Sequence, residues 1–540
     1  MKSKILNILN MLLAVVLLGG LSACEDFIDI EERGSQNLDN YFANESEAEA
    51  FVNGLYKSFA NWDDWWQQII RLTNIMATDD AWMGNLQQDP SDHYALAHYF
   101  VESSNAPGSL KNFYTYKYLN IGSCNIAISE IPNADINEEL KERLVGEAKF
   151  FRAFSYWELV QNFGDVVLIT EPEGTSGLNK GRSPKAEVYA QIVKDLKEAA
   201  AVLPEAYDDE DLGRVTSWAC KALLARTYLF MQDYDNAYAY ADTVIREGSF
   251  SLEPNFVDIW SVYNHHGVES IFEINASSEQ NYNVGNRFSV VMCARGEIWP
   301  EGEEDKIMDG WGWCVPSSNL EQAFLSEGDE IRRKSTIITV GDAVYGDEEE
   351  NPNYQFSLDI NKSGRVWRKY YVPISMRRQL TTKDRHIPLP MILLRLGEMY
   401  LTRAEAAYFL GNEGQAKEDI KTIRARVGLG DKDDLTGNDL LYAIWKERRL
   451  ELASEGLRLY DLRRQIDPVS GKPRIAEAMG PSGYFVQYNL YESTDPYETI
   501  HPEEPQDKGI RFKEGQHELW PIPQSEIDRS NGVISQNPGY

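Results

Sequence analysis

The chain has 540 residues, of which 43% are hydrophobic and 11% aromatic, and its formal net charge is −32 at pH 7. This length exceeds one compact core of ordinary size, so we expect two lobes or an elongated solenoid. Nucleic-acid phosphates and anionic lipid surfaces recruit lysine and arginine. The acidic balance therefore argues against a nucleic-acid partner and against peripheral attachment to an anionic membrane.

Residues 1–23 have the pattern of an export leader. Lys2 and Lys4 give it a positive start, and its apolar run is shorter than the roughly 20 residues of a spanning helix. The leader runs into Leu21-Ser22-Ala23-Cys24, which resembles the lipobox of bacterial lipoproteins. The resemblance implies that Cys24 becomes a lipidated N-terminus that anchors the protein to a membrane, followed by a tether over residues 24–40.

The tether begins with a run of acidic residues, Glu25, Asp26, Asp29, Glu31 and Glu32. An acidic tract directly after the lipidated cysteine resembles the signal that displays lipoproteins on the outer face in one large group of Gram-negative bacteria. We therefore expect the protein at the cell surface, anchored in the outer membrane. A solvated tether with no sorting role is the simpler alternative.

Residues 41–260 carry mostly helical patterns. Asn44 and Glu47 have the spacing of a capping box at the start of the first helix. Apolar periodicity predicts further helices at about 109–131, 138–163, 187–203, 216–231 and 235–246. The aromatic stretch 61–108 lacks helical periodicity, and we expect a loop there.

Residues 261–384 are expected to form an irregular insertion, and the loss of periodicity begins at about Glu247. Short β-type runs occur at 271–274, 289–292 and 337–340. An insertion of this length without a regular core of its own is usually functional, because loops carry binding sites on rigid scaffolds. We therefore expect ligand-binding loops in this part of the chain.

Residues 385–540 return to helical patterns. Helices are predicted at about Ile392–Leu410, 416–427 and 439–456, and small residues at the contact of the first two indicate a tetratricopeptide-type hairpin. The pattern that begins at Asn412 parallels one that begins at Asp233. The predicted fold is mainly α: an interrupted tetratricopeptide-like α–α superhelix with a loop-rich irregular subdomain that contains a few short strands.

Glu398 and Glu405 project close to the apolar stripe of the first of these helices. A carboxylate that enters a core needs a charged or hydrogen-bonding partner, and Arg395 opens an arginine-rich segment. We interpret Arg395, Glu398 and Glu405 as structural ion pairs. The sharper alternative is a catalytic carboxylate pair, which no histidine or cysteine accompanies in the sequence.

Four stretches together resemble the SusD/RagB family of outer-membrane nutrient-binding lipoproteins: Glu147–Asp165, Leu394–Ala406, Glu447–Gly456 and Trp520–Asp528. The resemblance implies a helical scaffold with a non-catalytic site built from loops, without a cofactor. Such proteins sit over a TonB-dependent outer-membrane transporter of the SusC type. They capture oligosaccharides, or in some members peptides, for import.

Two irregular stretches are rich in tryptophan. The apolar face of a pyranose ring stacks on an indole plane, and its hydroxyl groups need polar partners. We predict ligand-binding roles for Trp65, Trp66, Asp79, Trp82, Asn85, Arg287, Trp299, Trp311 and Trp313. The alternative for any one tryptophan is that it pins a loop onto the scaffold.

Other chemistry is weakly indicated. The sequence contains no metalloprotease helix motif, P-loop or nucleophile elbow, and we expect no metal site. Cys293 and Cys314 have a separation that permits a disulfide in an oxidising exterior, although sequence cannot establish one. A secreted glycoside hydrolase and a protein-binding helical scaffold are the competing functions.

Overall fold

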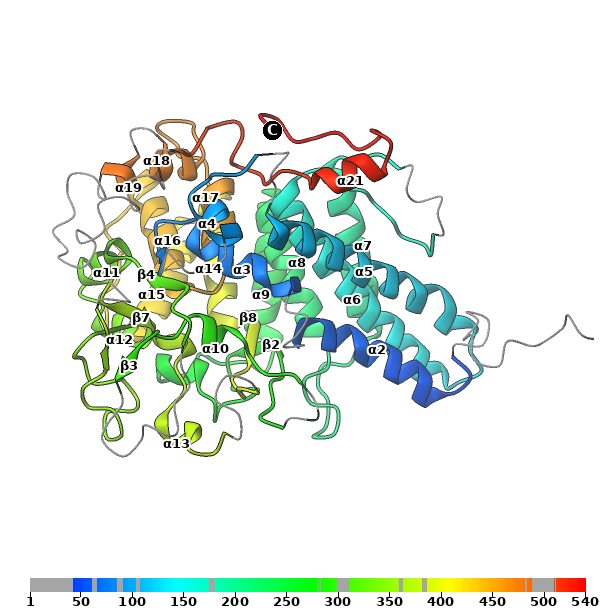
Figure 1. Ribbon diagram of the computed structural model, residues 1–540, viewed down its shortest axis with the longest axis horizontal. Coiled ribbons are helices and arrows are strands. Elements are labelled where there is room, and N and C mark those ends of the chain that lie inside the picture. Colours follow the sequence, from blue (N-terminus) through cyan, green and yellow to red (C-terminus); the bar gives the residue numbers. More distant parts are fainter. Residues whose placement is uncertain are drawn as a thin grey trace, which may run out of the picture.

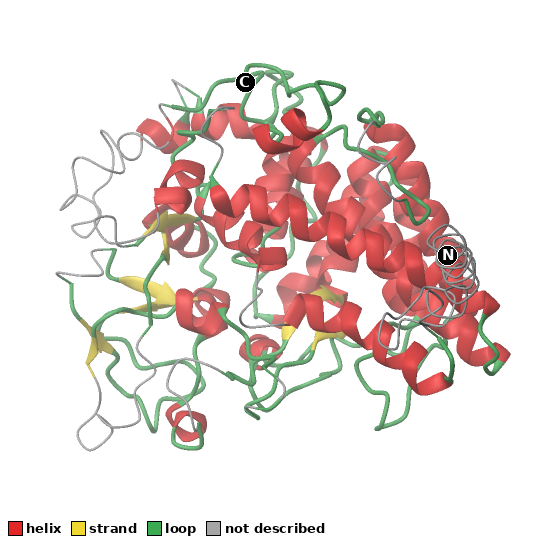
Figure 2. Ribbon diagram, turned by 45° about the vertical axis from the view of Figure 1, so that its right-hand side comes forward, coloured by secondary structure: helices red, strands yellow, loops and turns green. Residues whose placement is uncertain are grey.

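We describe the protein from a computed structural model. The structure describes residues 42–60, 66–84, 91–102, 107–173, 180–279, 281, 283–298, 310–358, 363–380, 386–480, 483–487, 509 and 511–540. Helices fill one side of the molecule, and loops with short strands gather on the other (Figures 1 and 2). Of the helices in these ranges, none combines the length and the apolar composition needed to cross a membrane.

The N-terminal part is a series of long helices that pack on their neighbours in the sequence. These are α2 (Glu45–Ala60), α5 (Gly108–Glu130), α6 (Glu138–Phe163), α7 (Lys185–Val202), α8 (Ser217–Met231) and α9 (Tyr234–Glu247), with a short η3 turn (Ile131–Asn133) after α5. The predicted cap of α2 is present, because Asn44 Oδ1 accepts a hydrogen bond from the Glu47 amide at 3.0 Å.

The superhelix continues across the insertion. Helix α14 (Leu396–Phe409) packs against α8 and α9, and α15 (Glu413–Arg426) and α16 (Gly437–Glu451) follow it. The second helices of the two hairpins share one cap geometry. Asp233 accepts from the Asn236 amide and Asn412 from the Gln415 amide, both at 3.2 Å. The predicted interrupted superhelix is thus confirmed.

The insertion is held at its base by an antiparallel pair of strands, β2 (Ser270–Ile274) and β8 (Met391–Arg395). Three further two-stranded sheets join β1 (Ala81–Met83) to β4 (Cys314–Pro316), β3 (Glu297–Ile298) to β6 (Gln355–Phe356), and β5 (Ile337–Thr339) to β7 (Arg365–Trp367). Short helical turns fill the space between them: η5 (Phe256–Trp260), α10 (Phe288–Val291), α11 (Ser318–Leu325), α12 (Glu330–Thr336), η7 (Arg368–Tyr370) and α13 (Ile374–Arg377).

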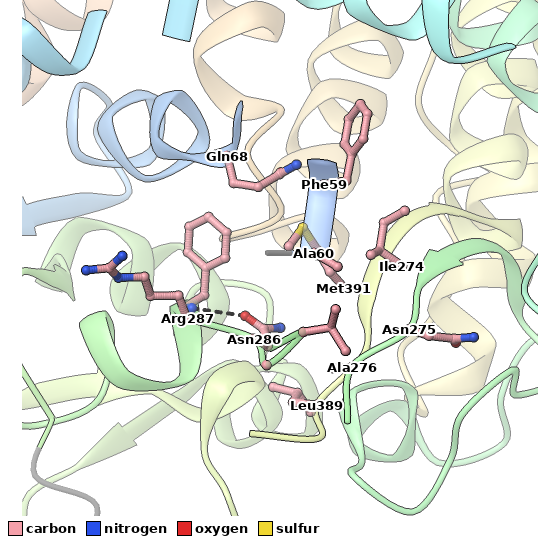
Figure 3. A pocket seen from close by; sticks show the side chains of 13 residues that line it. Phe59, Ala60, Gln68, Ile274, Asn275, Ala276, Asn286, Arg287, Leu389 and Met391 are labelled. Carbon is pink, nitrogen blue, oxygen red and sulfur yellow. Dashed lines mark hydrogen bonds between the residues drawn. The ribbon is translucent and has the colours of Figure 1, made fainter. Parts of the chain in front are cut away.

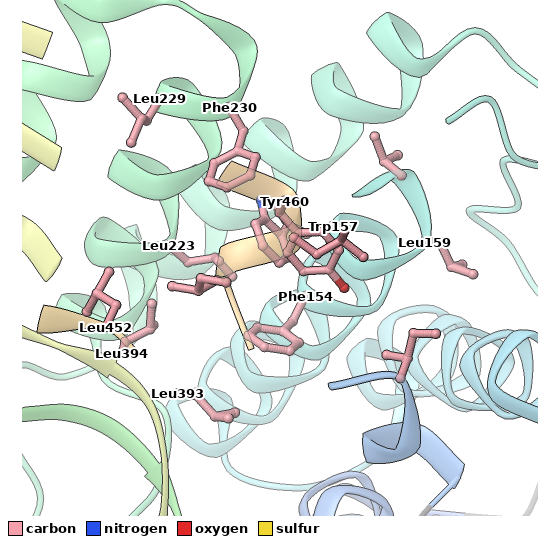
Figure 4. Packing of buried hydrophobic residues seen from close by; sticks show 14 of the residues in the cluster. Phe154, Trp157, Leu159, Leu223, Leu229, Phe230, Leu393, Leu394, Leu452 and Tyr460 are labelled. Atoms are coloured by element: carbon pink, nitrogen blue, oxygen red, sulfur yellow. The ribbon is translucent and has the colours of Figure 1, made fainter. Parts of the chain in front are cut away.

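The main core joins the two helical parts of the chain. Trp157 of α6 lies edge-on to Phe230 of α8, at 5.3 Å between ring centroids, and to Tyr460 of α17 (Arg458–Arg464), at 5.5 Å (Figure 4). Burying an aromatic side chain of this size stabilises the fold by about 2–3 kcal/mol. The C-terminal chain adds α18 (Arg474–Met479), α19 (Tyr484–Gln487) and α21 (Gln524–Arg529) around this core.

Several predicted elements need correction. The expected helix at Ile392–Leu410 begins only at Leu396, because the apolar run before it forms strand β8. The run 289–292 lies in helix α10 and its C-cap and is not a strand. The helix expected to end at 456 ends at Glu451, where a series of turns precedes α17.

The stretch 61–108 is not wholly irregular. It contains α3 (Trp66–Met76), β1 and α4 (Ser91–Ala97). From Gln68 to Met76, all side chains except that of Arg71 are buried. Its sequence does carry a polar face at helical spacing, formed by Gln67, Arg71 and Asn74. The expectation of a loop here is wrong because this pattern covers only 11 residues of a longer aromatic stretch.

Buried ion pairs connect the insertion to the superhelix. Arg395 of β8 contacts Glu269 and Glu451 at 2.7 Å and Glu455 at 2.8 Å. Two further arginines share these carboxylates: Arg426 pairs with Glu269 and Glu451, and Arg332 of α12 pairs with Glu451 at 3.2 Å. We call Arg332, Arg395, Arg426, Glu269, Glu451 and Glu455 the Arg395 cluster. It ties β8, α12, α15 and α16 together.

The other two carboxylates singled out in the sequence also have arginine partners. Glu398 contacts Arg226 at 2.5 Å, and Glu405 contacts Arg464 at 2.6 Å. Both carboxylates are buried. The arginine partners expected of structural ion pairs are therefore present. They occupy the oxygens that a catalytic pair would need to keep available.

The cysteines and acidic groups form no further site in the part of the chain that the structure describes. Cys293 and Cys314 are both buried free thiols, so the possible disulfide between them is not formed. Across the same ranges, no three histidine, cysteine, aspartate or glutamate side chains gather as metal ligands would.

Candidate functional site

Two of the predicted ligand-binding side chains lie in the interior. Asp79 is fully buried and receives both Arg458 (2.8 Å) and the Tyr484 hydroxyl (2.5 Å). Burial acts to raise the pKa of Asp79, but Arg449 and Arg458 hold it well below its ordinary value. The carboxylate is therefore ionised and already paired, and it serves the scaffold rather than a ligand.

Trp82 is the second interior residue. It lies in β1 opposite Val315 of β4, is only 6% exposed, and packs on Phe485 with 5.0 Å between ring centroids. This tryptophan therefore fits the alternative interpretation, in which the indole pins a loop onto the scaffold. The sequence gave no sign of its burial, because a three-residue strand is too short to show a period.

Four other predicted residues cannot be placed as side chains. Trp65, Asn85 and Trp299 lie outside the described residues, and Trp66 opens α3 with its side chain also outside them. Their ligand-binding roles stay predictions.

The remaining three predicted residues come together in space. Trp311 and Trp313 are half-buried, and their ring centroids lie 4.7 Å apart at an interplanar angle of 44°. The Arg287 guanidinium lies 5.1 Å from the Trp311 ring, and the His93 ring lies 5.0 Å from Trp313. One aromatic surface is thus built by His93 of α4 and by the two indoles, which lie just before strand β4. Arg287, the N-cap residue of α10, stacks as a cation on one of its rings.

Backbone contacts fix the segment that carries the two indoles. The amides of Trp311 and Trp313 donate to the carbonyls of Val290 and Val291, each at 2.9 Å. Glycines make the close packing possible. A Cβ on Gly84 would lie 1.8 Å from the Gly312 carbonyl oxygen, and Gly312 itself has φ +63°. The indoles are therefore presented by a tightly held backbone.

A hollow of about 340 Å³ adjoins this aromatic surface, with Arg287 as the residue common to both (Figure 3). Phe59, Ile274 and Met391 give it apolar walls, and the Asn286 side chain accepts a hydrogen bond from the Phe288 amide at 2.9 Å. Figure 3 shows the Arg287 guanidinium directed away from the other side chains that line the hollow. The Trp311 ring, which lies 5.1 Å from that guanidinium, is outside the hollow's lining.

Gln68 is the functional candidate that sequence reasoning missed. Its side chain reaches into the hollow from α3 and is 3% exposed, yet neither its amide oxygen nor its amide nitrogen has a hydrogen-bond partner among the described residues (Figure 3). Leaving a buried amide unsatisfied costs about 1–3 kcal/mol. The sequence gave no distinct signal for this residue, because Gln67 and Arg71 are polar neighbours of similar appearance on the same helix.

The arrangement suits recognition of a neutral, hydroxyl-rich ligand. Indole faces accept the apolar side of a sugar ring, while the Gln68 amide offers one donor group and one acceptor to its hydroxyls. We define the Trp311 site as Trp311, Trp313, Arg287 and Gln68.

Family models match both parts of the chain. One described as "SusD family" matches residues 268–540, slightly more than half of the sequence. A second, described as "Starch-binding associating with outer membrane", matches residues 26–229. The first match begins just before strand β2, and the second ends within helix α8, so residues 230–267 lie between them.

Relatives of similar length are known. The SusD-like protein P2 of Formosa agariphila is 26% identical over 552 residues, covering 97% of this chain and 98% of its own. The starch-binding protein SusD of Bacteroides thetaiotaomicron is 24% identical over 411 residues, covering 66% of this chain and 71% of its own.

Solved structures share the fold. A laminarin binding SusD-like protein has a TM-score of 0.74 at 26% identity, with 92% of this chain and 100% of that chain covered. Surface glycan-binding protein A from Bacteroides thetaiotaomicron, in complex with laminarihexaose, has a TM-score of 0.71 at 22% identity, with 91% and 99% covered. The interrupted superhelix, the order of the sequence motifs and both family matches agree. The chain belongs to the SusD family.

Proposed function

We propose that this protein is a surface lipoprotein that captures oligosaccharides at the Trp311 site and delivers them to a TonB-dependent transporter of the SusC type. The observation that carries the proposal is the pair of half-buried indoles, 4.7 Å apart, with Arg287 stacked on one of them. It is a binding protein and not an enzyme, and the descriptions of two relatives name starch binding and glycan binding.

The relatives support a glucan as the first ligand to test. A structure at 26% identity is described as laminarin binding, and it covers 92% of this chain. Laminarihexaose is therefore the probe of choice, together with neutral hexasaccharides of other linkages, namely maltohexaose, cellohexaose, xylohexaose and mannohexaose.

The experiment compares binding of these hexasaccharides, by isothermal titration calorimetry, to the wild type and to Trp311→Ala. A central indole of a binding site contributes about 2 kcal/mol or more, so we expect Kd to rise about 30-fold or more. Phe409→Ala is the matched control. This ring is 41% exposed and stacks on Tyr234 at 4.3 Å, on the hairpin tips of α9 and α14. Equal affinities of both variants would remove the Trp311 site from the proposal.

The membrane and transporter parts of the proposal rest on the leader and on the family description. The family model over residues 26–229 is described as associating with the outer membrane. We expect the full chain to fractionate with outer membranes and to co-purify with a β-barrel transporter. Cys24→Ser should release it from the membrane fraction without changing its affinity for oligosaccharides, because Cys24 precedes the helical scaffold.

A further inference from the structure

A second hollow lies on the helical side of the molecule. It is bounded by α5, by the extended segment 166–173 that follows α6, and by α21 with the turn after it. Its empty volume of about 1350 Å³ exceeds the 340 Å³ of the hollow beside the Trp311 site. In Figure 1, α5 and α21 lie on the right, whereas β4, which follows the two indoles, lies on the left. We call this second hollow the α5–α21 groove.

One wall of the groove is aromatic and apolar. Tyr114 and Tyr118 of α5 lie with their ring centroids 4.8 Å apart, and Ile121 and Ile126 extend the same face along the helix. The Tyr118 hydroxyl donates to the Val167 carbonyl at 2.8 Å, which fixes its ring against the extended segment. This wall presents flat rings of the kind that sugar faces contact.

One buried polar atom on the lining, Glu173 Oε2, has no hydrogen-bond partner in the described part of the chain. Tyr114 is 3% exposed, its ring lies edge-on to Phe163 at 5.1 Å, and its hydroxyl is hydrogen-bonded to Tyr118. Tyr114 therefore supports the Tyr118 ring from inside the protein. The groove offers the Glu173 oxygen as an unused acceptor, which a ligand hydroxyl group would satisfy.

The charges on the rim disfavour an anionic ligand. Arg529 contacts Glu526 at 3.0 Å, and Lys180 pairs with Glu173. Both cations are thus already matched by carboxylates, while Glu171 adds a further negative charge to the lining. A neutral ligand meets no such repulsion.

Most backbone carbonyls of the extended segment are already hydrogen-bonded, which disfavours a peptide that would add as a strand. The Val167 carbonyl accepts from Tyr118, the Ile169 carbonyl and amide both bond to the Tyr156 hydroxyl, and Asn125 donates to the Glu171 carbonyl at 3.2 Å. Strand addition requires free amides and carbonyls along an edge. Recognition in this groove is therefore left to side chains.

We propose that the α5–α21 groove is a second binding site for a neutral oligosaccharide, with the half-buried Tyr118 as its stacking surface and Glu173 as a hydrogen-bond acceptor. The inference rests on the proposed function, since it assigns a second attachment point to the same class of ligand. Two sites on one protein raise the apparent affinity for a long polysaccharide, because the second contact becomes intramolecular.

Gly122 allows the groove to be filled without disturbing the fold. It lies within α5 on the groove lining, and a Cβ added there meets no atom within 4 Å. Gly54 within α2 has the same open surroundings and does not line the groove. Gly122→Trp and Gly54→Trp are thus a matched pair, since both replace a helical glycine by a residue of higher helix propensity.

The test is calorimetric titration with the hexasaccharide of the five-member panel that the wild type binds best. We expect two sites per wild-type chain and per Gly54→Trp chain, and one per Gly122→Trp chain. The Trp311→Ala/Trp313→Ala double variant should keep one site. Adding Gly122→Trp to this double variant should abolish the remaining site.

The outcomes separate the two proposals. Equal site numbers in Gly122→Trp and Gly54→Trp overturn the groove while leaving the Trp311 site intact. Binding that survives the double indole variant unchanged and is lost in Gly122→Trp supports the groove and overturns the Trp311 site. If none of the five hexasaccharides binds the wild type, both proposals fall.

Discussion

Two buried regions of this protein differ in whether their polar side chains have partners. In the Arg395 cluster, every side chain has an oppositely charged partner, and Arg395 alone contacts three carboxylates within 2.8 Å. In the hollow beside the Trp311 site, the Gln68 amide is equally buried and has no hydrogen-bond partner among the described residues. Within the described residues, Arg332 Nη2 and Arg426 Nε of the cluster also lack a hydrogen-bond partner, but each of these side chains is ion-paired, whereas the Gln68 side chain has no partner at either of its polar atoms.

This difference distinguishes the helical scaffold, which we call the frame, from the ligand site. A buried charge that has lost its partner is strongly destabilising, so a paired cluster fixes the relative position of the elements it joins. An amide that stays unsatisfied lowers stability in the free protein, and a ligand that bonds to it recovers that free energy on binding. We therefore expect substitutions in the two regions to change stability in opposite directions.

The largest effect is expected from Glu451→Gln. Burial acts to raise the pKa of Glu451, but Arg426, Arg395 and Arg332 hold it well below its ordinary value, so the wild-type residue is charged. Removing that charge leaves three arginines short of a partner and should lower the free energy of unfolding by about 3–5 kcal/mol. Urea denaturation of the wild type and the variant measures this difference in the free energy of unfolding.

Glu514→Gln is the control for that experiment. Glu514 pairs with Lys472 at 2.9 Å, but both side chains are half exposed, and solvent screens the pair. We expect no measurable change in its unfolding midpoint. A Glu451→Gln variant as stable as Glu514→Gln would show that the Arg395 cluster does not hold the frame.

A smaller, pH-dependent effect is expected at His517. Its Nδ1 accepts the Lys513 amide hydrogen at 2.9 Å, its ring stacks on Tyr99 at 5.4 Å, and the side chain is 2% exposed. Burial, with Lys513 and Arg463 nearby, lowers its pKa to about 4. Folding thus favours the neutral ring, which keeps its full stabilising effect above the unfolded pKa of about 6.5.

As pH falls from about 6.5 through 4, that contribution should be lost, up to about 3 kcal/mol. His517→Gln should flatten the fall in unfolding free energy over this window by the same amount. Urea unfolding at pH 7 and pH 4.5 isolates the residue, since all other titrating groups are common to both proteins. Parallel pH profiles of wild type and variant would mean that His517 is protonated without cost.

Sequence periodicity predicted most helices of the superhelix, because apolar residues recur at helical spacing along them. The hairpins at α8–α9 and α14–α15 were found from their apolar stripes and from the parallel of Asp233 with Asn412. Helix α3 was missed although its polar and apolar residues fall at helical spacing, because that pattern covers only 11 residues of a longer aromatic stretch.

The site was only partly predictable. Trp311, Trp313 and Arg287 were chosen from composition, and the fold brings them together. Asp79 was chosen by the same reasoning, yet it pairs with arginines nearly 380 positions further along the chain. No local pattern in the sequence distinguishes a carboxylate kept for a ligand from one matched by a distant arginine, because the pairing depends on tertiary contacts.

The smallest effect has the opposite sign and tests the comparison most directly. Gln68→Met removes an unsatisfied amide at similar volume, so we expect unfolding free energy to rise by about 1 kcal/mol while hexasaccharide affinity falls. Asn74→Leu, on the same helix, removes an equally buried amide that Trp520 Nε1 donates to at 3.2 Å, and it should destabilise the protein. Urea midpoints and calorimetric titrations measure both effects. Were Gln68→Met to lose stability as Asn74→Leu does, the Gln68 amide would be part of the frame, and the contrast between the two regions would disappear.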